Sequence, residues 1–184
     1  VTCDYMDGRR YEGEWKDGEF HGQVKLEFLD GRRYEGEWKD NLPNGQGTSY
    51  EVDESIQKGE WKDGFLNGLA IVNETSTGRR YEGEFENGQP KNATMENPDG
   101  GRYEGEFKDG TPEGHGTADY ADGTRYEGQW KQGVKHGDGT LYNDDGRRCE
   151  SEWKNNLPNG QGTMYGPEGN REYEGGFKDG EFHG

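Results

Sequence analysis

The sequence is short of the residues that build an ordinary protein core. Hydrophobic residues make up only 25% of the 184-residue chain, and the formal net charge is −17. A composition this polar and this charged is typical of disordered chains. Two features contradict that interpretation: the 34 glycines fall at regular positions, and aromatic residues, which bury a large area each, make up 12% of the chain. We therefore expect an ordered protein whose core consists mainly of rings.

Other absences narrow the classes of function. The deficit of basic residues disfavours nucleic acid, which needs a basic surface. The chain has no apolar run long enough to span a membrane and no secretory signal. The two cysteines, Cys3 and Cys149, are too far apart in a linear repeat array to form a disulfide, which fits a reducing compartment. We expect an intracellular, cytoplasmic protein.

One short stretch, residues 34–40 with the sequence YEGEWKD, recurs throughout the chain. Its copies begin about every 23 residues, and a fixed period of this size indicates a repeat architecture. The copies begin at Tyr11, Tyr34, Gln57, Tyr81, Tyr103, Tyr126, Cys149 and Tyr173. We predict that residues 1–184 form one continuous array of about seven full repeats and a truncated eighth, and that the array is a segment of a longer protein.

Each repeat has the pattern of two short strands joined by a tight turn. With the tyrosine as position 0, Tyr, Gly at +2 and an aromatic residue at +4 alternate with Glu, Glu and Lys, which is the period of a strand with one buried face. Asp-Gly pairs such as Asp17-Gly18, or asparagine in their place, favour a hairpin turn at +6 and +7. No segment has a helical period. The predicted fold is all-β: an elongated, twisted, single-layer antiparallel sheet of tandem β-hairpins, with rings on one face and charged ladders on the other.

The pattern Tyr-x-Gly-x-Trp-x-x-Gly-x-x-x-Gly-x-Gly, with an Asp-Gly turn before the next unit, resembles the MORN repeat (membrane occupation and recognition nexus). The resemblance extends from about Gly8 to Gly184. It implies a solenoid-like ribbon of hairpins with non-catalytic roles: scaffolding, protein–protein contact, homodimerisation, and association with membranes or with cytoskeletal structures such as cilia. Single repeats depart from the pattern at Gln57, Cys149 and Ser151, and one repeat has lost the glycines of its second strand.

No catalytic constellation accompanies the repeats. The glutamates at +1 and +3 are expected to face solvent rather than a closed pocket, and no nucleophile is paired with a base. Histidines of the same phase lie whole repeats apart, and the Asp-Gly pairs fit turns better than calcium loops. The Gly-x-Gly-Thr motif lacks the lysine of a phosphate-binding loop. We therefore predict no enzymatic activity, no cofactor and no metal.

The phased rings are interpreted first as the core of the sheet. A single layer cannot bury both sides of every ring, so we also expect exposed ring surface that could receive a partner peptide or helix. The candidate partner-binding aromatics are Tyr11, Trp15, Tyr34, Trp38, Trp61, Tyr81, Phe85, Tyr103, Phe107, Tyr126, Trp130 and Trp153.

A row of arginines just before the tyrosines offers a weaker, lipid-binding interpretation. The candidate headgroup ligands are Arg33, Arg80, Arg102, Arg125 and Arg148. The glutamates at +1 and +3 offset each arginine, and the net charge of −17 disfavours direct docking on anionic lipid.

The favoured function is a non-catalytic repeat scaffold that binds a protein partner, or a second copy of itself, through an aromatic groove or a sheet edge. Its expected setting is a ciliary, cytoskeletal or membrane-associated assembly. The alternatives are a phospholipid-targeting module and the regulatory array of a larger enzyme, such as a phosphatidylinositol phosphate kinase.

Overall fold

The computed structural model describes residues 1–183, which form β-strands joined by turns and contain no helix. The strands are β1 (Thr2–Asp4), β2 (Arg10–Lys16), β3 (Glu19–Glu27), β4 (Arg33–Lys39), β5 (Leu42–Tyr50), β6 (Ile56–Lys62), β7 (Phe65–Glu74), β8 (Arg79–Glu86), β9 (Gln89–Glu96), β10 (Arg102–Lys108), β11 (Thr111–Asp119), β12 (Arg125–Lys131), β13 (Val134–Tyr142), β14 (Arg148–Lys154), β15 (Leu157–Tyr165), β16 (Arg171–Lys178) and β17 (Glu181–His183). All seventeen belong to one antiparallel sheet of hairpins, which confirms the predicted all-β class.

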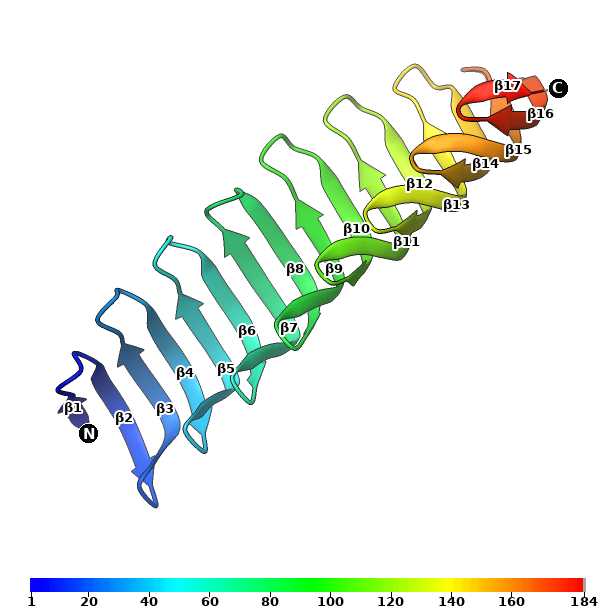
Figure 1. The fold of residues 1–184 in the computed structure, drawn as a ribbon. Coiled ribbons are helices and arrows are strands. Elements are labelled where there is room, and N and C mark those ends of the chain that lie inside the picture. The colour runs from blue at the N-terminus through cyan, green and yellow to red at the C-terminus, as the bar shows by residue number, and fades with distance from the viewer. Residues whose placement is uncertain (184) are drawn as a thin grey trace. The chain divides into compact units, whose positions relative to one another are not determined.

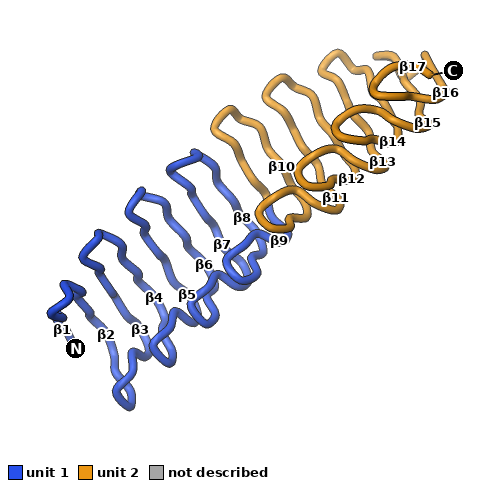
Figure 2. The backbone as a smooth tube through the Cα atoms, viewed as in Figure 1, with its two compact units in different colours: residues 1–93 blue, residues 94–184 orange. Residues whose placement is uncertain are grey.

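The chain forms two compact units, residues 1–93 and 94–184, and the division falls inside β9 (Figure 2). In the first unit β2/β3, β4/β5 and β6/β7 are hairpins, and each hairpin pairs with the next one along the chain. In the second unit the hairpins β10/β11, β12/β13, β14/β15 and β16/β17 follow the same scheme (Figure 1). Within each unit a hairpin is thus bonded to its neighbours in sequence.

The tight turn of each hairpin has the left-handed backbone that the sequence predicts. Asp17 and Gly18 have φ angles of 53° and 87°, and the repeat that uses asparagine has 51° at Asn155 and 71° at Asn156. Positive φ at both central residues is the requirement of a type I′ turn, whose twist matches that of the flanking strands. The prediction of turns at +6 and +7 is confirmed.

A buried tyrosine closes a defect in several of the hairpins. Between the glycine at +2 and the ring at +4 the strand register shifts, for example between Gly128 and Trp130, and the residue at +3 is left out of the ladder. The hydroxyl of Tyr126 donates a hydrogen bond to the carbonyl oxygen of this residue, Gln129, at 3.1 Å. Tyr103 does the same to Glu106 at 3.0 Å. A bulge normally leaves a peptide group without a ladder partner, and here the tyrosine supplies that partner.

The glycines of the two strands have different tasks. A Cβ atom built on the second-strand glycine Gly139 would lie 2.2 Å from the hydroxyl oxygen of Tyr126, so the ring occupies the place of the missing side chain. A Cβ on Gly128, at +2, would instead lie 2.5 Å from the Cα atom of Gly139. The +2 glycine thus admits the neighbouring backbone, and the tyrosine ring lies over the second-strand glycine.

The aromatic residue at +4 links one hairpin to the next. The ring centroid of Tyr126 lies 5.2 Å from that of Trp130 in the same hairpin and 5.3 Å from that of Trp153 in the following one, both edge to face. The indole Nε1 of Trp153 donates a hydrogen bond to the carbonyl oxygen of Gly139, at 2.9 Å. Edge-to-face pairs contribute about 0.5–1.5 kcal/mol beyond the area they bury. The core of each unit is this chain of rings.

Trp38 is an exception to this scheme. Its indole nitrogen is buried without a hydrogen-bond partner, whereas the Nε1 of Trp61 bonds the carbonyl oxygen of Gly47 at 3.1 Å. The residue fourteen positions before Trp38 is Val24 rather than glycine, and its side chain is itself buried, with 4% exposed. We attribute the missing hydrogen bond to the space that this valine takes up.

The first prediction compares two tryptophan substitutions. Trp130→Phe should lower the free energy of unfolding by about 0.5–1.5 kcal/mol more than Trp38→Phe, because only Trp130 loses a hydrogen bond, to the carbonyl of Gly116. Both substitutions remove the same part of the indole, so each is the control for the other. Urea denaturation followed by circular dichroism measures the difference. Equal destabilisation would contradict the assignment.

Candidate functional site

The predicted ring row lies in the core rather than on an open surface. Eleven of the twelve candidate aromatics are at most 9% exposed, and only Trp15, with 39%, presents substantial ring surface. Residues after the tight turn help to cover them: Phe20 stacks on Tyr11 with a centroid distance of 4.2 Å, and Lys135 places its Nζ 5.3 Å from the ring of Tyr126. The core interpretation is confirmed, and the expected open ring row is corrected. A partner contact with these rings stays a prediction.

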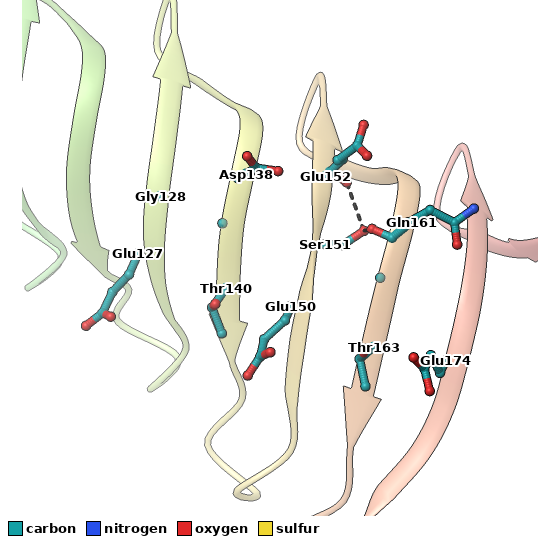
Figure 3. Close-up of a pocket in the computed structure, with 12 residues that line it drawn as sticks. Glu127, Gly128, Asp138, Thr140, Glu150, Ser151, Glu152, Gln161, Thr163 and Glu174 are labelled. Carbon is teal, nitrogen blue, oxygen red and sulfur yellow. Dashed lines mark hydrogen bonds between the residues drawn. The ribbon is translucent and has the colours of Figure 1, made fainter.

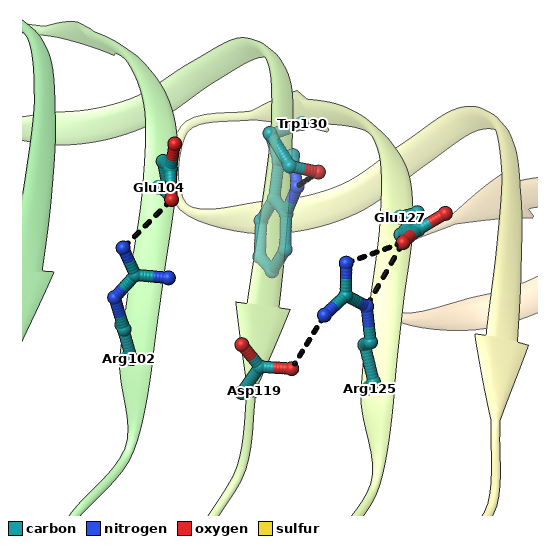
Figure 4. A network of polar contacts seen from close by, with 7 residues as sticks. Arg102, Glu104, Asp119, Arg125, Glu127 and Trp130 are labelled. Atoms are coloured by element: carbon teal, nitrogen blue, oxygen red, sulfur yellow. Dashed lines mark hydrogen bonds and ion pairs between the residues drawn. The ribbon is translucent and has the colours of Figure 1, made fainter.

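Each arginine of the predicted lipid-binding row is already paired with a glutamate. The partner is the glutamate two residues later: Arg102–Glu104 at 2.7 Å and Arg125–Glu127 at 2.6 Å are shown in Figure 4. The pairs Arg33–Glu35 at 3.9 Å, Arg80–Glu82 and Arg148–Glu150 at 2.9 Å complete the row. The hydrogen bond that the Arg148 guanidinium donates to Glu150 raises the pKa of Arg148. These exposed pairs contribute little to stability, but they offset the charge of the row.

The exposed face of the second unit carries an alternating row of arginine and tyrosine. Across β12 to β16 the residues stand directly opposite one another in the register, strand after strand. We call this row the Arg–Tyr ladder; its members are Arg125, Tyr142, Arg148, Tyr165 and Arg171. The guanidinium of Arg148 lies over the ring of Tyr165, with its Cζ 3.8 Å from the centroid. Such stacking fixes both side chains as flat plates on the sheet.

The first unit has one such pair but no ladder. Arg33 lies 3.8 Å over the ring of Tyr50, in the same geometry as Arg148 and Tyr165. The residue opposite Tyr50 on the next strand is Ile56, where the second unit has arginine, and Asn73 follows. Tyr50 is therefore an isolated copy of the arrangement, and it provides an internal control for any role of the ladder.

An open trough of about 620 Å³ runs beside the Arg–Tyr ladder (Figure 3). Five carboxylates line it, and no lysine or arginine does; we call it the acidic trough, and its charged residues are Glu127, Asp138, Glu150, Glu152 and Glu174. Asp138 and Glu152 stand opposite each other on β13 and β14, and like charges in this position repel. No ion pair to either carboxylate is found in residues 1–183. Arginines of the Arg–Tyr ladder pair with Glu127, Glu150 and Glu174, so the negative potential that favours a cationic group comes mainly from Asp138 and Glu152.

The corresponding trough of the first unit differs in charge. It has a volume of about 770 Å³, and Lys25 and Lys58 lie among the glutamates that line it. Lys25 forms ion pairs with Glu27 at 3.2 Å and Glu35 at 3.8 Å. Internal cations thus balance part of the negative charge there. The two units share a backbone plan but present different surfaces.

One wall of the acidic trough contains the repeat that departs most from the pattern. Cys149 stands where six of the other seven repeats have tyrosine, and Ser151 stands where all seven have the +2 glycine. The Ser151 hydroxyl donates a hydrogen bond to the carbonyl oxygen of Glu152 at 2.9 Å, the same +3 carbonyl that a tyrosine would satisfy (Figure 3). A Cβ on Gly162 would meet the Ser151 Oγ at 2.7 Å, as it would meet a tyrosine hydroxyl elsewhere. Serine replaces the lost tyrosine hydroxyl.

The second prediction tests this replacement with a double-mutant cycle. Ser151→Gly should destabilise the chain because it leaves a buried carbonyl without a donor. Cys149→Tyr should also destabilise it, because the new hydroxyl needs the space of the Ser151 side chain. The double variant restores the pattern of the other repeats, so the two effects should fail to add by about 1–3 kcal/mol in its favour. Urea denaturation of the four proteins measures this coupling.

Gly128→Ser is the control for that cycle. Its Cβ would lie 2.7 Å from the hydroxyl of Tyr126, which already fills the space, so the added serine should only destabilise. Additive effects of Cys149→Tyr and Ser151→Gly would mean that Ser151 does not substitute for a tyrosine hydroxyl.

Residues 1–183 offer no grouping of His, Cys, Asp or Glu side chains suited to hold a metal ion. The same residues contain no helix that is long and apolar enough to cross a bilayer. Burial raises the pKa of the Cys149 thiol to about 11, so this thiol stays protonated near neutral pH. The chemistry on the exposed face is therefore charge and aromatic surface, which suits binding.

Sequence reasoning found the arginines of this face but missed its tyrosines. Tyr142 and Tyr165 were visible as second-strand tyrosines, yet the sequence does not say which residue stands opposite which. The register places Arg148 between them. Side chains alternate between the two faces of a strand, so counting residues from the tight turn assigns Tyr142 and Tyr165 to the face of Glu127 and Glu150. This alternation is the signal that could have identified the two tyrosines.

Comparison with known protein families and structures agrees with the repeat pattern. The family model described as the MORN repeat matches residues 11–32, 34–50, 58–71, 81–91, 103–125, 126–147, 149–171 and 173–184. Seven of these matches begin at a predicted repeat start, and the third begins one residue after Gln57. No curated protein matches the chain.

Several solved structures match the chain at low identity. The TCP domain of SAS-4 (dCPAP) from Drosophila melanogaster, in complex with a proline-rich motif of Ana2 (dSTIL), is 11% identical with a TM-score of 0.55, and the match covers 95% of this chain and 88% of that one. The G-box domain of the microcephaly protein CPAP is 13% identical, with coverages of 94% and 96% and a TM-score of 0.39. The TCP10 domain of Danio rerio CPAP with a STIL peptide is 16% identical, with coverages of 96% and 93% and a TM-score of 0.29. Only the first score is high enough to compare folds.

Proposed function

The chain belongs to the MORN repeat family, and we propose that it is a non-catalytic scaffold that binds a segment of a partner protein on the exposed face of its second unit. The observation that carries the proposal is the pairing of the Arg–Tyr ladder with the acidic trough. Aromatic side chains beside a negative surface whose Asp138 and Glu152 have no cationic partner in residues 1–183 suit a peptide better than a small molecule. The trough is open and its lining is polar, whereas small-molecule sites are enclosed and mostly apolar.

The family and the fold both support this proposal. The matching family model is a structural repeat, and residues 1–183 contain no metal-binding group. The TCP domain of SAS-4, which has the same fold, was solved in complex with a proline-rich motif of another protein, so a sheet of this kind can receive a peptide. The proposal moves the contact surface from the buried ring row, which the hairpins need for their own core, to the opposite face.

We place this scaffold inside the cell, in a cytoskeletal or ciliary assembly, as the family resemblance implies. Self-association through sheet edges is the other protein–protein mode to consider, since unpaired edge strands favour pairing with a second copy. Light scattering after size exclusion separates the two modes. A chain that stays monomeric at high concentration and still binds a peptide fits the proposal.

The third prediction concerns peptide binding. A random peptide library displayed on phage should yield ligands for the chain, and Asp138→Lys/Glu152→Lys should weaken their binding by about tenfold or more, or about 1.4 kcal/mol. Both side chains are exposed, so the variant should fold. Glu60→Lys/Glu84→Lys in the first unit carries the same charge change and should bind as the original protein does. An unbiased library without any enriched ligand would overturn the proposed function.

The fourth prediction addresses the membrane alternative. The chain should remain in the unbound fraction when it is floated with vesicles of phosphatidylcholine, phosphatidylserine and phosphatidylinositol bisphosphate at low salt, because glutamates pair its arginines and its net charge is −17. Glu104→Gln/Glu127→Gln/Glu150→Gln removes the glutamate partners of Arg102, Arg125 and Arg148 and lowers the net negative charge, so it should increase the bound fraction. Flotation of the unmodified chain with these vesicles would instead favour a lipid-targeting module.

A further inference from the structure

We propose that the occupant of this face is a proline-rich segment in the polyproline II conformation, with basic side chains on one edge, that crosses strands β13 to β16. The proline edge packs on the Arg–Tyr ladder, and the basic edge lies over the acidic trough. This inference rests on the proposed function and specifies the chemistry of the partner. Three observations support it: the spacing of the tyrosines, the stacking of Arg148 on Tyr165, and the charge of the trough.

The spacing of the ladder matches the period of polyproline II. Tyr142 and Tyr165 lie at the same place in consecutive hairpins, with Arg148 on the strand between them. Two strand spacings of about 4.8 Å separate them by about 9.6 Å. A polyproline II segment advances about 3.1 Å per residue with three residues per turn, so every third side chain recurs after about 9.3 Å. Prolines three residues apart can therefore contact both tyrosines at once.

An α-helix fits this spacing less well. Its side chains return to the same face after seven residues, which corresponds to about 10.5 Å. A helix also needs a broad apolar groove for its buried face, and the surface beside the ladder is lined by carboxylates and threonines. A narrow segment that carries its own backbone polar groups in contact with water suits such a surface better.

The flat geometry of the ladder suits proline. The Cζ atom of Arg148 lies 3.8 Å from the ring centroid of Tyr165, and the guanidinium also donates a hydrogen bond to Glu150 at 2.9 Å. These two contacts fix the position of the guanidinium. Tyr142 and Tyr165 are half-buried, which fixes their rings and leaves part of each exposed. Fixed aromatic surface is what proline-rich segments bind, and a rigid plate and a rigid ligand lose little conformational entropy on association.

The acidic trough supplies the charge preference. Asp138 and Glu152 repel each other across the strands and have no cationic partner in the described part of the chain. A guanidinium placed between them would remove this repulsion and form charge-assisted hydrogen bonds. In a polyproline II segment the residue after each proline points to a different edge, so prolines can face the ladder while arginines face the trough.

The fifth prediction uses a fluorescently labelled peptide with four Pro-Ala-Arg triplets, titrated with the chain and followed by fluorescence anisotropy. It should bind with a Kd below about 1 mM. Tyr142→Ala/Tyr165→Ala should weaken binding by about tenfold or more, whereas Tyr50→Ala, which removes the isolated copy in the first unit, should change it less than about twofold. Circular dichroism and thermal unfolding show whether each variant is folded.

Two control peptides separate conformation from charge. Four Gly-Ala-Arg triplets carry the same charge without the polyproline II preference, and should bind at least about fivefold more weakly than the proline peptide. Four Pro-Ala-Glu triplets keep the conformation and reverse the charge, and should not bind. Equal binding of the glycine and proline peptides would overturn the inference, and so would binding that Tyr142→Ala/Tyr165→Ala leaves unchanged.

Failure of the inference about a proline-rich partner can be distinguished from failure of the proposed scaffold function. If the proline peptide does not bind but the unbiased library yields other ligands, the scaffold function stands and the proline-rich partner is wrong. If the library also yields none, both are wrong. Ligands from the library with helical patterns and no proline would identify a helix as the occupant and would likewise overturn this inference.

Discussion

The bulge at the +3 residue, which recurs in hairpins of both units, is the constraint on which the rest of the structure depends. It leaves one carbonyl group outside the strand ladder, and a buried polar group without a partner is costly. In Tyr34, Tyr103 and Tyr126 the hydroxyl reaches this carbonyl across the second strand, where a glycine lies beneath the ring. The ring of Tyr126 also provides the contact surface for the tryptophan of the next hairpin. The bulge of β6/β7 occurs without this tyrosine and glycine, with Gln57 and Ala70 in their places.

In the repeat with Cys149 and Ser151 the hydrogen bond to the +3 carbonyl is kept although the residue that makes it changes. When the tyrosine is absent, a serine on the neighbouring glycine position donates to the same +3 carbonyl. The substitution keeps the backbone of β14 and β15 in the common register while it removes a ring from the core. Repeat proteins tolerate such local exchanges because each unit depends only on its neighbours. The exchange also forms part of the wall of the acidic trough.

The demands of the core determine where a partner can bind. Rings that complete their own hairpin are buried and have little surface left, so the opposite face carries the variable chemistry. Arginine–glutamate pairs along each strand offset charge locally, and what distinguishes the second unit is the row next to them: its tyrosines alternate with arginines, and its trough has no lysine. The first unit has Tyr50 and lysines instead. The common backbone thus carries two different surfaces.

The sequence by itself determined the period, the hairpin turns, the strand alternation and the identity of the core rings, because these depend on local backbone preferences and on side chains a few residues apart. It also placed the arginines beside their glutamates, since both lie on one strand. Only the tertiary structure decided that the rings are closed off, that the tyrosine lies over the second-strand glycine, and that Tyr142, Arg148 and Tyr165 stand in one row. Cross-strand register, which the bulges shift, brings these residues together, and no pattern within a single strand records it.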